Sequence, residues 1–403
     1  MADDDALLLK GLVTVDRKLA GIETHLGAVR PSASPAAAIA SSTPSTASAV
    51  VAATAARAAS GGQGAGTVAA ANVSGGLPTK VHETLQVCYR SAGIGVWGAV
   101  LRYGGMPLEK IAIISNSSQV SGSGQLAQAV KITFKDGALA PFKVVGSASL
   151  VAWFLQYSVM GFVFQSCDSA LSSALGVDKM VYGEALFKPA KEKSKESEGA
   201  AYQAKSALKC LAAPLAAGMI ESVVSNRAEV QRFYGIDKMT AIEAKLKWNL
   251  LSKQCGPAFM ANTSRNFIMS STSFVITPSL FSTMMPDDMK TSSNLLAFGM
   301  GVNIFGGNVI AITQQALWGR ACDYAAAEGG RKIDYKKVVQ TSLKAEGYSA
   351  FFTLEKWFAR VLMNAPAQGT IPWFYNEVLP MGEPAVIGAA ASIYQLGGGG
   401  SAK

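Results

Sequence analysis

Three long stretches of the chain contain no acidic side chain, lysine, arginine or histidine. They cover residues 144–167, 266–286 and 291–319. A helix needs roughly 20 mostly apolar residues to cross the hydrocarbon core of a bilayer, and each stretch is long enough. One such stretch would fit a buried core helix of a large soluble protein, but three in one chain favour a membrane. We therefore expect a helical membrane protein.

The composition agrees with this expectation. Only 16% of the 403 residues are charged and 49% are hydrophobic, and the mean hydropathy is +0.24. Soluble domains carry about 25% charged residues. The net charge of +9 falls mostly between the hydrophobic stretches, where basic residues orient membrane helices. Because the chain lacks the basic and aromatic clusters typical of single-strand binding, we expect no nucleic-acid partner.

Few residues are available for catalysis or metal binding. His25 and His82 are the only histidines, and the five cysteines show no paired spacing. We find no Ser/His/Asp set, paired carboxylates or metal-ligand cluster, and therefore expect neither an enzyme nor a metal centre. Gly93, Gly95 and Gly98 match the dinucleotide pattern Gly-x-Gly-x-x-Gly, but they follow no strand and suit close helix packing instead.

Residues 1–28 are expected to form a helix with an apolar seam. The seam residues recur at alternating spacings of four and three, which is the heptad pattern of a coiled coil. The opposite face mixes acidic and basic side chains, so the helix suits docking against a partner helix, with a membrane surface as the alternative. The seam comprises Leu8, Leu12, Val15, Leu19, Ile22 and Leu26.

Two segments are expected to be flexible. Residues 29–80 are mostly Ala, Ser, Thr, Gly and Pro, a composition that cannot build a packed core and is typical of a tether. Residues 386–403 end in a glycine-rich run and are expected to form a flexible tail. The body between these two segments therefore carries the fold.

The body offers six candidate spans. Three of them contain an ionisable residue, namely Arg102, Glu221 or Arg360. Ionisable groups inside spans usually face a bundle interior or a water-filled cavity. The segments after the first, third and fifth spans are long and basic, which places them on the inner side of the membrane. The candidate spans are residues 85–106, 144–167, 206–226, 266–284, 295–318 and 357–375.

A partial pattern, Pro-x-(Asp/Glu)-x-x-(Lys/Arg), recurs at the ends of the first, third and fifth spans. Proline kinks a helix, and the backbone groups that it frees find partners within a bundle. The first copy has Ala112 at the basic position, and the second has Arg227 at the proline position. The matching residues are Pro107 and Glu109, then Glu229 and Arg232, then Gln315 at the acidic position with Arg320 near the basic one.

This pattern is the signature of the mitochondrial carrier family, which the chain resembles. Residues 334–366 strengthen the resemblance, because Glu346-Gly347 is followed by Phe351-Phe352 and then by Arg360-x-x-Met363-x-x-Pro366. The resemblance implies an all-α membrane protein with six transmembrane helices in three pseudo-symmetric two-helix repeats. The implied repeats are residues 81–198, 199–289 and 290–385, and the implied location is the mitochondrial inner membrane.

The resemblance also implies where a substrate would bind. In working carriers the even-numbered helices grip it, and the equivalent positions here are Trp153, Arg265 and Met363. Only Arg265 is charged, and its alternative role is to pair with an interior acid such as Glu221. Trp153 and Met363 are more often packing residues than ligands.

Two gates would close such a carrier in turn. The matrix gate would use Pro107, Glu109, Glu229, Arg232, Gln315 and Arg320. The opposite gate uses (Phe/Tyr)-(Asp/Glu) on the even helices, where this chain offers Phe164-Gln165 and Tyr375-Asn376, with no clear equivalent in the second repeat. Alternating access needs two closed states of similar free energy, and each lost ion pair shifts that balance.

Two functions follow from the resemblance. We favour a non-transporting accessory subunit that docks through its N-terminal helix into a larger inner-membrane complex of respiratory-chain or ATP synthase type. The alternative is a divergent solute carrier that exchanges a small anionic metabolite near Arg265. Either role has membrane lipid as a partner, and a bound cardiolipin or other anionic lipid is compatible with both. No other cofactor is expected.

Overall fold

The computed structural model describes residues 77–116, 120, 124–143, 147–189, 199–234, 255–328 and 333–398. Within these ranges every regular element is helical and there is no strand. The predicted N-terminal helix, nearly all of the predicted linker and the last residues of the tail lie outside the described residues. The predicted seam residues Leu8, Leu12, Val15, Leu19, Ile22 and Leu26 are among them.

The described helices form six long rods. Rods 1 to 3 are single helices, namely α3 (Thr79–Gly104), α7 (Ser147–Leu175) and α8 (Ala200–Tyr234). Rod 4 joins α11 (Phe259–Ser271), the π-helical turn η3 (Thr272–Ile276) and α12 (Thr277–Met284). Rod 5 joins α13 (Ser292–Val302), the π-helical turn η5 (Asn303–Gly307) and α14 (Asn308–Glu328). Rod 6 joins α16 (Leu354–Asn364), η7 (Ala365–Gly369), α17 (Ile371–Trp373), η8 (Phe374–Val378) and α18 (Leu379–Gly398).

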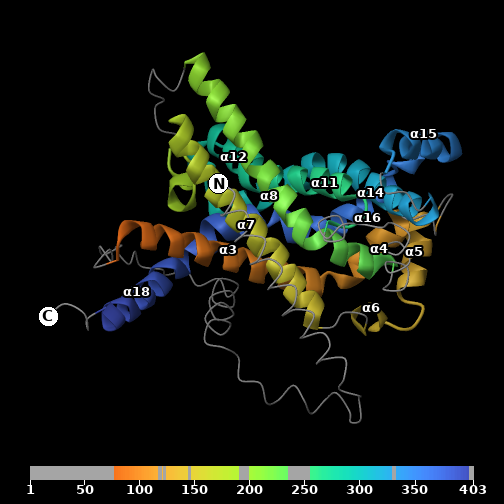
Figure 1. Cartoon of the computed structure of the whole chain (residues 1–403), viewed down its shortest axis with the longest axis horizontal. Helices are drawn as coiled ribbons and strands as arrows, with labels where there is room; N and C mark the ends of the chain where they lie inside the picture. The colour runs from red at the N-terminus through yellow and green to blue at the C-terminus, as the bar shows by residue number, and fades with distance from the viewer. Residues whose placement is uncertain are drawn as a thin grey trace, which may run out of the picture. The chain divides into compact units, whose positions relative to one another are not determined.

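Short helices connect the rods. Between rods 1 and 2 lie α4 (Met106–Asn116), α5 (Gln125–Thr133) and α6 (Ala140–Lys143). Rods 5 and 6 are joined by α15 (Tyr335–Glu346) and η6 (Gly347–Ala350). Turns η2 (Gly183–Phe187) and η4 (Asp287–Met289) follow rods 2 and 4. The short helices α5 and α15 lie at the same end of the bundle, on the right of Figure 1.

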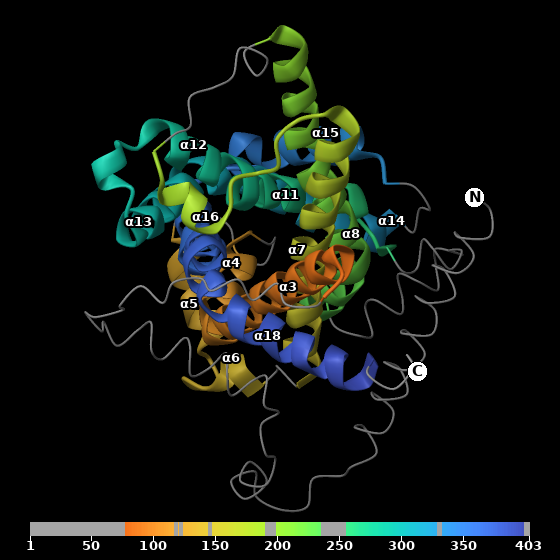
Figure 2. The ribbon, with the colours of Figure 1, turned by 90° about the vertical axis from the view of Figure 1, so that its left-hand side faces the viewer.

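The rods form a closed ring in chain order. α3 packs on α7, α7 on α8, and α8 on α11. α11 then packs on α14, α14 packs on α16, and α18 returns to α3. Figure 2 shows α18 alongside α3. A ring of this kind gives each rod one face toward its neighbours and the interior and one face away from them.

The outward faces are apolar and the inward faces are polar. On α8, Leu211 is 59% exposed and Leu215 is 49% exposed, whereas Glu221 and Asn226 are buried. Soluble proteins distribute side chains in the opposite way. An apolar outer surface around a polar interior suits lipid outside the ring and protein contacts inside it.

Three rods are long and apolar enough to cross a bilayer, namely Leu150–Leu175, Ala200–Val230 and Ser292–Ala327. Two of them overlap the charge-free stretches 144–167 and 291–319. The third stretch, 266–286, lies in rod 4, whose first turns contain Asn262, Arg265 and Asn266 and are therefore less apolar. The described chain is thus all-helical with three candidate spans, and six spans in three repeats remain a prediction.

Candidate functional site

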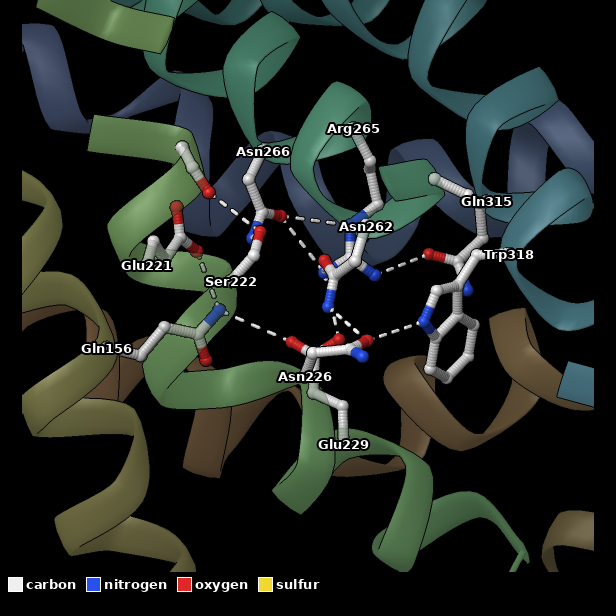
Figure 3. Close-up of polar contacts among 12 residues, drawn as sticks. Gln156, Glu221, Ser222, Asn226, Glu229, Asn262, Arg265, Asn266, Gln315 and Trp318 are labelled. Carbon is white, nitrogen blue, oxygen red and sulfur yellow. Dashed lines mark hydrogen bonds and ion pairs between the residues drawn. The ribbon is translucent and has the colours of Figure 1, made fainter. Parts of the chain in front are cut away.

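Arg265 on α11 connects three rods inside the ring. Its side chain is buried, and its Nη2 forms an ion pair with Glu229 Oε2 on α8 at 2.8 Å. Its Nη1 donates a hydrogen bond to Gln315 Oε1 on α14, also at 2.8 Å (Figure 3). Glu229 and Gln315 occupy the acidic positions of the second and third signature copies. The structure therefore brings two predicted gate residues onto the predicted substrate-binding arginine.

Two asparagines of α11 take up further donors of Arg265. Asn262 Oδ1 accepts from Nη2 at 2.7 Å, and Asn266 Oδ1 accepts from Nε at 3.1 Å. Asn262 in turn donates from Nδ2 to Asn226 Oδ1 at 2.6 Å. A guanidinium offers five N–H donors and no acceptor. Each of the three nitrogens of Arg265 therefore has a protein partner.

Asn226 on α8 fixes the approach to α11. Its Nδ2 donates to the carbonyl oxygens of Cys255 at 2.7 Å and Pro257 at 2.8 Å, and its Oδ1 accepts from Trp318 Nε1 at 2.8 Å. Between these two carbonyls, Gly256 has a φ of +72°, in the left-handed region that favours glycine. The tight turn before α11 is therefore held by a side chain from the neighbouring rod.

Arg102, near the end of α3, contacts three other helices inside the ring. Its Nη1 pairs with Glu109 Oε1 on α4 at 2.7 Å, and its Nε donates to Tyr157 Oη on α7 at 2.9 Å. The Met363 Sδ of α16 lies 3.9 Å from Nη1. Met363, a predicted substrate position, thus contacts an arginine whose carboxylate partner is the first signature acid.

Gln156 on α7 links two carboxylates of α8. Its Nε2 lies 2.7 Å from Glu221 Oε1 and 3.3 Å from Glu229 Oε1. The interior side chains that join these two arginines, their carboxylate partners and the amides between them are named the ionic layer. The ionic layer comprises Arg102, Glu109, Gln156, Glu221, Glu229, Arg265 and Gln315.

The three even-numbered rods also touch directly across the ring. Gln368 on η7 donates from Nε2 to Tyr157 Oη on α7 at 3.2 Å, and its carbonyl oxygen accepts from Ser273 Oγ on η3 at 3.3 Å. Rods 2, 4 and 6 alternate with the odd rods in chain order around the ring, so these bonds cross its interior. We name these three residues the even-rod bridge.

An aromatic layer joins the same three rods. Phe164 on α7 stacks on Phe274 of η3 with ring centroids 4.7 Å apart, and Phe274 meets Tyr375 of η8 edge-on at 5.7 Å. Phe274 lies in the predicted second repeat, where sequence reasoning found no equivalent of Phe164 and Tyr375. A spacing signal was present, because Phe274 lies about as far past residues 262–265 as Phe164 lies past Trp153.

The remaining predicted site residues lie elsewhere. Trp153 is buried in α7, one turn before Tyr157, and Pro107 is the second residue of α4. Arg320 pairs with Glu346 of α15 through Nη2 and Oε2 at 2.7 Å, rather than joining the ionic layer. The hydrogen bond from Arg320 lowers the pKa of Glu346. The side chain of Arg232 lies outside the described residues.

Two further ion pairs between neighbouring rods were not predicted. Lys209 Nζ of α8 lies 2.8 Å from Asp168 Oδ1 of α7, and both side chains are buried. Arg90 of α3 pairs with Glu383 of α18 through Nε and Oε2 at 2.8 Å, which ties the first rod to the last. A lone charge within an apolar helix was the available signal, since such a charge needs a partner.

Searches with protein-family models, among curated proteins and among solved structures found no match to this chain. The resemblance to mitochondrial carriers therefore remains a prediction from the sequence motifs.

Proposed function

We propose that this chain is a six-span protein of the mitochondrial inner membrane that resembles a carrier but does not transport, and that it serves as a structural subunit of a larger membrane complex. The observation that carries this proposal is the occupied interior. The arginine expected to bind substrate, Arg265, has protein partners at each nitrogen, and the interior is crossed at two other levels.

The order of the rods supports the carrier-like part of the proposal. Six rods close in chain order, and short helices follow the first and fifth rods at the same end of the bundle. Family members are expected to have long and short helices in this order. The apolar outer faces, such as Leu211 and Leu215, fit a lipid environment.

The contacts between rods support the non-transporting part. An alternating-access carrier opens to one side at a time, and the two states must have similar free energies. Opening this ring at the ionic layer would separate buried ion pairs, at roughly 3–5 kcal/mol for each carboxylate or arginine left without its partner. Opening the ring at the aromatic layer would separate Phe274 from Phe164 and Tyr375. A substrate would have to offset these terms by binding the open state more tightly.

The N-terminal seam provides a test of docking. The full chain, extracted from its own membranes in mild detergent, should migrate on native gels well above the mass of a single copy. Replacing two seam residues, Leu12→Asp with Leu19→Asp, should release it to the mass of a single copy. The matched control is Thr14→Asp with Gly21→Asp, which adds the same charges one heptad apart but off the seam.

The structural-subunit proposal has a clear opposite outcome. If the wild-type chain runs alone in mild detergent, or if the seam and off-seam variants migrate identically at high mass, the N-terminal helix does not dock the chain into a complex. The proposal would also be contradicted if the complex that contains the seam variant resisted detergent as well as the wild-type complex does.

Arg360 favours a second candidate function, exchange of a small anionic solute. Its side chain is 4% exposed, and no ion pair joins it to a carboxylate within the described part of the chain. It lies within electrostatic range of two arginines, Arg102 and Arg265, and of the two carboxylates that pair with them, Glu109 and Glu229. A buried cation without a carboxylate partner suits an anion. Liposomes containing the purified chain should then exchange a keto acid, amino acid, nucleotide or phosphate, and Arg360→Ala should abolish that exchange. The structural-subunit proposal predicts no exchange of any of these solutes above empty liposomes.

A further inference from the structure

Glu221 is an interior carboxylate with an incomplete set of partners. It lies on α8 within a candidate span and is 3% exposed. Its Oε1 accepts a hydrogen bond from Gln156 Nε2 at 2.7 Å. Its Oε2 is buried and has no hydrogen-bond partner among the described residues. In Figure 3 only one of its two oxygens is joined to another side chain.

The nearby cations are already engaged with other carboxylates. Arg265 of α11 pairs with Glu229, and Arg102 of α3 pairs with Glu109. Both arginines and Glu229 act electrostatically on Glu221, but none of the described residues forms an ion pair with it. Glu221 is therefore the carboxylate of the ionic layer that lacks a cation of its own.

The geometry on α8 makes a second negative charge costly. Glu221 and Glu229 lie about two helical turns apart on the same inward face, and one amide, Gln156, donates to both. Two carboxylates that share one donor and one arginine in a low-dielectric interior repel each other. A carboxylate buried without a cation costs several kcal/mol, whereas a neutral carboxylic acid costs far less.

Two other buried polar atoms near Glu221 along the chain or in contact with it also lack partners among the described residues. They are Oε1 of Gln156, the residue that donates to Glu221, and the hydroxyl of Ser225, which lies about one turn further along α8. Of these atoms, Glu221 Oε2 and Gln156 Oε1 can only accept, and buried acceptors without donors call for a bound positive species or a proton. Among the described residues, the arginines that act on Glu221 are Arg265 and Arg102, and both are paired with other carboxylates. A proton on Glu221 is therefore favoured over a second protein cation.

We propose that Glu221 is a proton-binding site: its carboxylate takes a proton from water and is kept as a neutral carboxylic acid inside the ring. The reaction is the transfer of one proton from hydronium to the carboxylate, which leaves water, and no other bond changes. This inference goes beyond the proposed function, because the site exists whether or not the chain carries a solute or joins a complex.

The proton explains the arrangement of the ionic layer. With Glu221 neutral, Arg265 is free to pair with Glu229 and to donate to Gln315, as observed. Loss of the proton would place a second negative charge within range of Arg265 and would draw it away from Glu229. The occupancy of Glu221 therefore decides which carboxylate of α8 the arginine serves.

Infrared spectroscopy of the full chain in lipid tests the site. The C=O band of an un-ionised carboxyl should be present at pH 7 in the wild type and should be lost in Glu221→Gln, which keeps the shape of the side chain. Asp168→Asn is the matched control, since it removes a buried carboxylate that is paired with Lys209 of the same helix, α8, and should leave the band in place. Gln156→Leu should shift the band to higher frequency, because it removes the hydrogen bond to that carbonyl.

Three results would overturn the proposal. The first is no difference between the wild type and Glu221→Gln in the region of un-ionised carboxyls. The second is loss of the band in Asp168→Asn instead. The third is a carboxylate band of Glu221 that shifts when sodium chloride replaces choline chloride at constant pH, which would identify an alkali-metal site. If Glu221→Gln does not fold, a C=O band at the wild-type frequency in Gln156→Leu would also overturn the proposal.

Discussion

Arg265 and Glu229 form a buried ion pair across rods 3 and 4, with Nη2 and Oε2 2.8 Å apart. The resemblance to carriers assigns these residues to different tasks, the arginine to the substrate and the glutamate to the gate. In this chain they satisfy each other. Under the non-transporting role proposed above, this pair uses the expected binding position to hold two rods together.

Removing Arg265 should destabilise the protein strongly. Arg265→Ala leaves Glu229 buried without a cation, and breaking a buried pair in this way costs roughly 3–5 kcal/mol. Arg320→Ala is the matched control, because its pair with Glu346 is partly exposed and such pairs contribute about 0–1 kcal/mol. Thermal unfolding in detergent measures both variants. Equal losses in the two variants would show that the Arg265 pair is not buried.

The aromatic layer should contribute to stability through Phe274. Phe274→Ala removes the ring that contacts both Phe164 and Tyr375, and truncating a buried phenylalanine costs about 3–5 kcal/mol. Phe305, which is 73% exposed, provides the control, and Phe305→Ala should change stability by about 0.5 kcal/mol or less. The loss of unfolding temperature should be several times larger for Phe274→Ala. A smaller loss would mean that the layer is not packed.

Gly256 should resist substitution for two separable reasons. Its φ of +72° strains any residue with a Cβ by roughly 1–2 kcal/mol, and the added Cβ would lie 3.1 Å from Asn226 Nδ2. Gly176 has a similar φ of +65° but open space around its Cβ position. Gly176→Ala therefore measures the cost of the backbone conformation alone. Gly256→Ala should lose more stability than Gly176→Ala, because its Cβ also crowds Asn226. Equal losses of stability in the two variants would show that crowding against Asn226 does not contribute.

The pair between Arg320 and Glu346 should respond to acid. Because hydrogen bonding to Arg320 lowers the pKa of Glu346, the folded state releases the proton more readily than the unfolded state. The pair's contribution is therefore complete above the ordinary glutamate pKa and is lost as the pH falls through the lower folded value. The melting temperatures of the wild type and Glu346→Gln should differ slightly at pH 7 and converge below about pH 4. A gap that widens in acid would contradict this sign.

The distribution of charge and hydropathy allowed the coarse fold, an all-helical chain with apolar helices long enough to cross a membrane, to be predicted from the sequence. Each of the candidate spans overlaps one of the six described rods, although span 85–106 runs past the end of α3 at Gly104 into α4, and span 144–167 begins before the first described residue of α7, Ser147. The charge-free stretches gave the clearest signals. Arg102, Glu221 and Arg360 were expected inside a bundle, and each is buried. Helix ends were harder to place, because rods 4 to 6 contain π-helical turns that hydropathy does not reveal.

The partners of the site residues could not be predicted. The sequence offered Glu221 as the acid for Arg265, whereas the observed ion pair is with Glu229, two turns further along the same helix. Hydropathy identifies which residues face inward, but it does not set the rotation and stagger of one rod against the next. Long-range pairs such as Arg90 with Glu383 depend on closure of the ring, which no local pattern encodes.

Access of water to the even-rod bridge tests most directly whether the interior is closed. In the full chain with its native cysteines replaced, Ser273→Cys places a thiol at a position that is 1% exposed, and Tyr348→Cys places one at a position that is 86% exposed. A small, membrane-impermeant thiol reagent is then added to either side of the membrane. Our account predicts modification of Cys at position 348 from one side and no modification at position 273 from either side. Modification at position 273 would show that the interior opens, and would contradict the account.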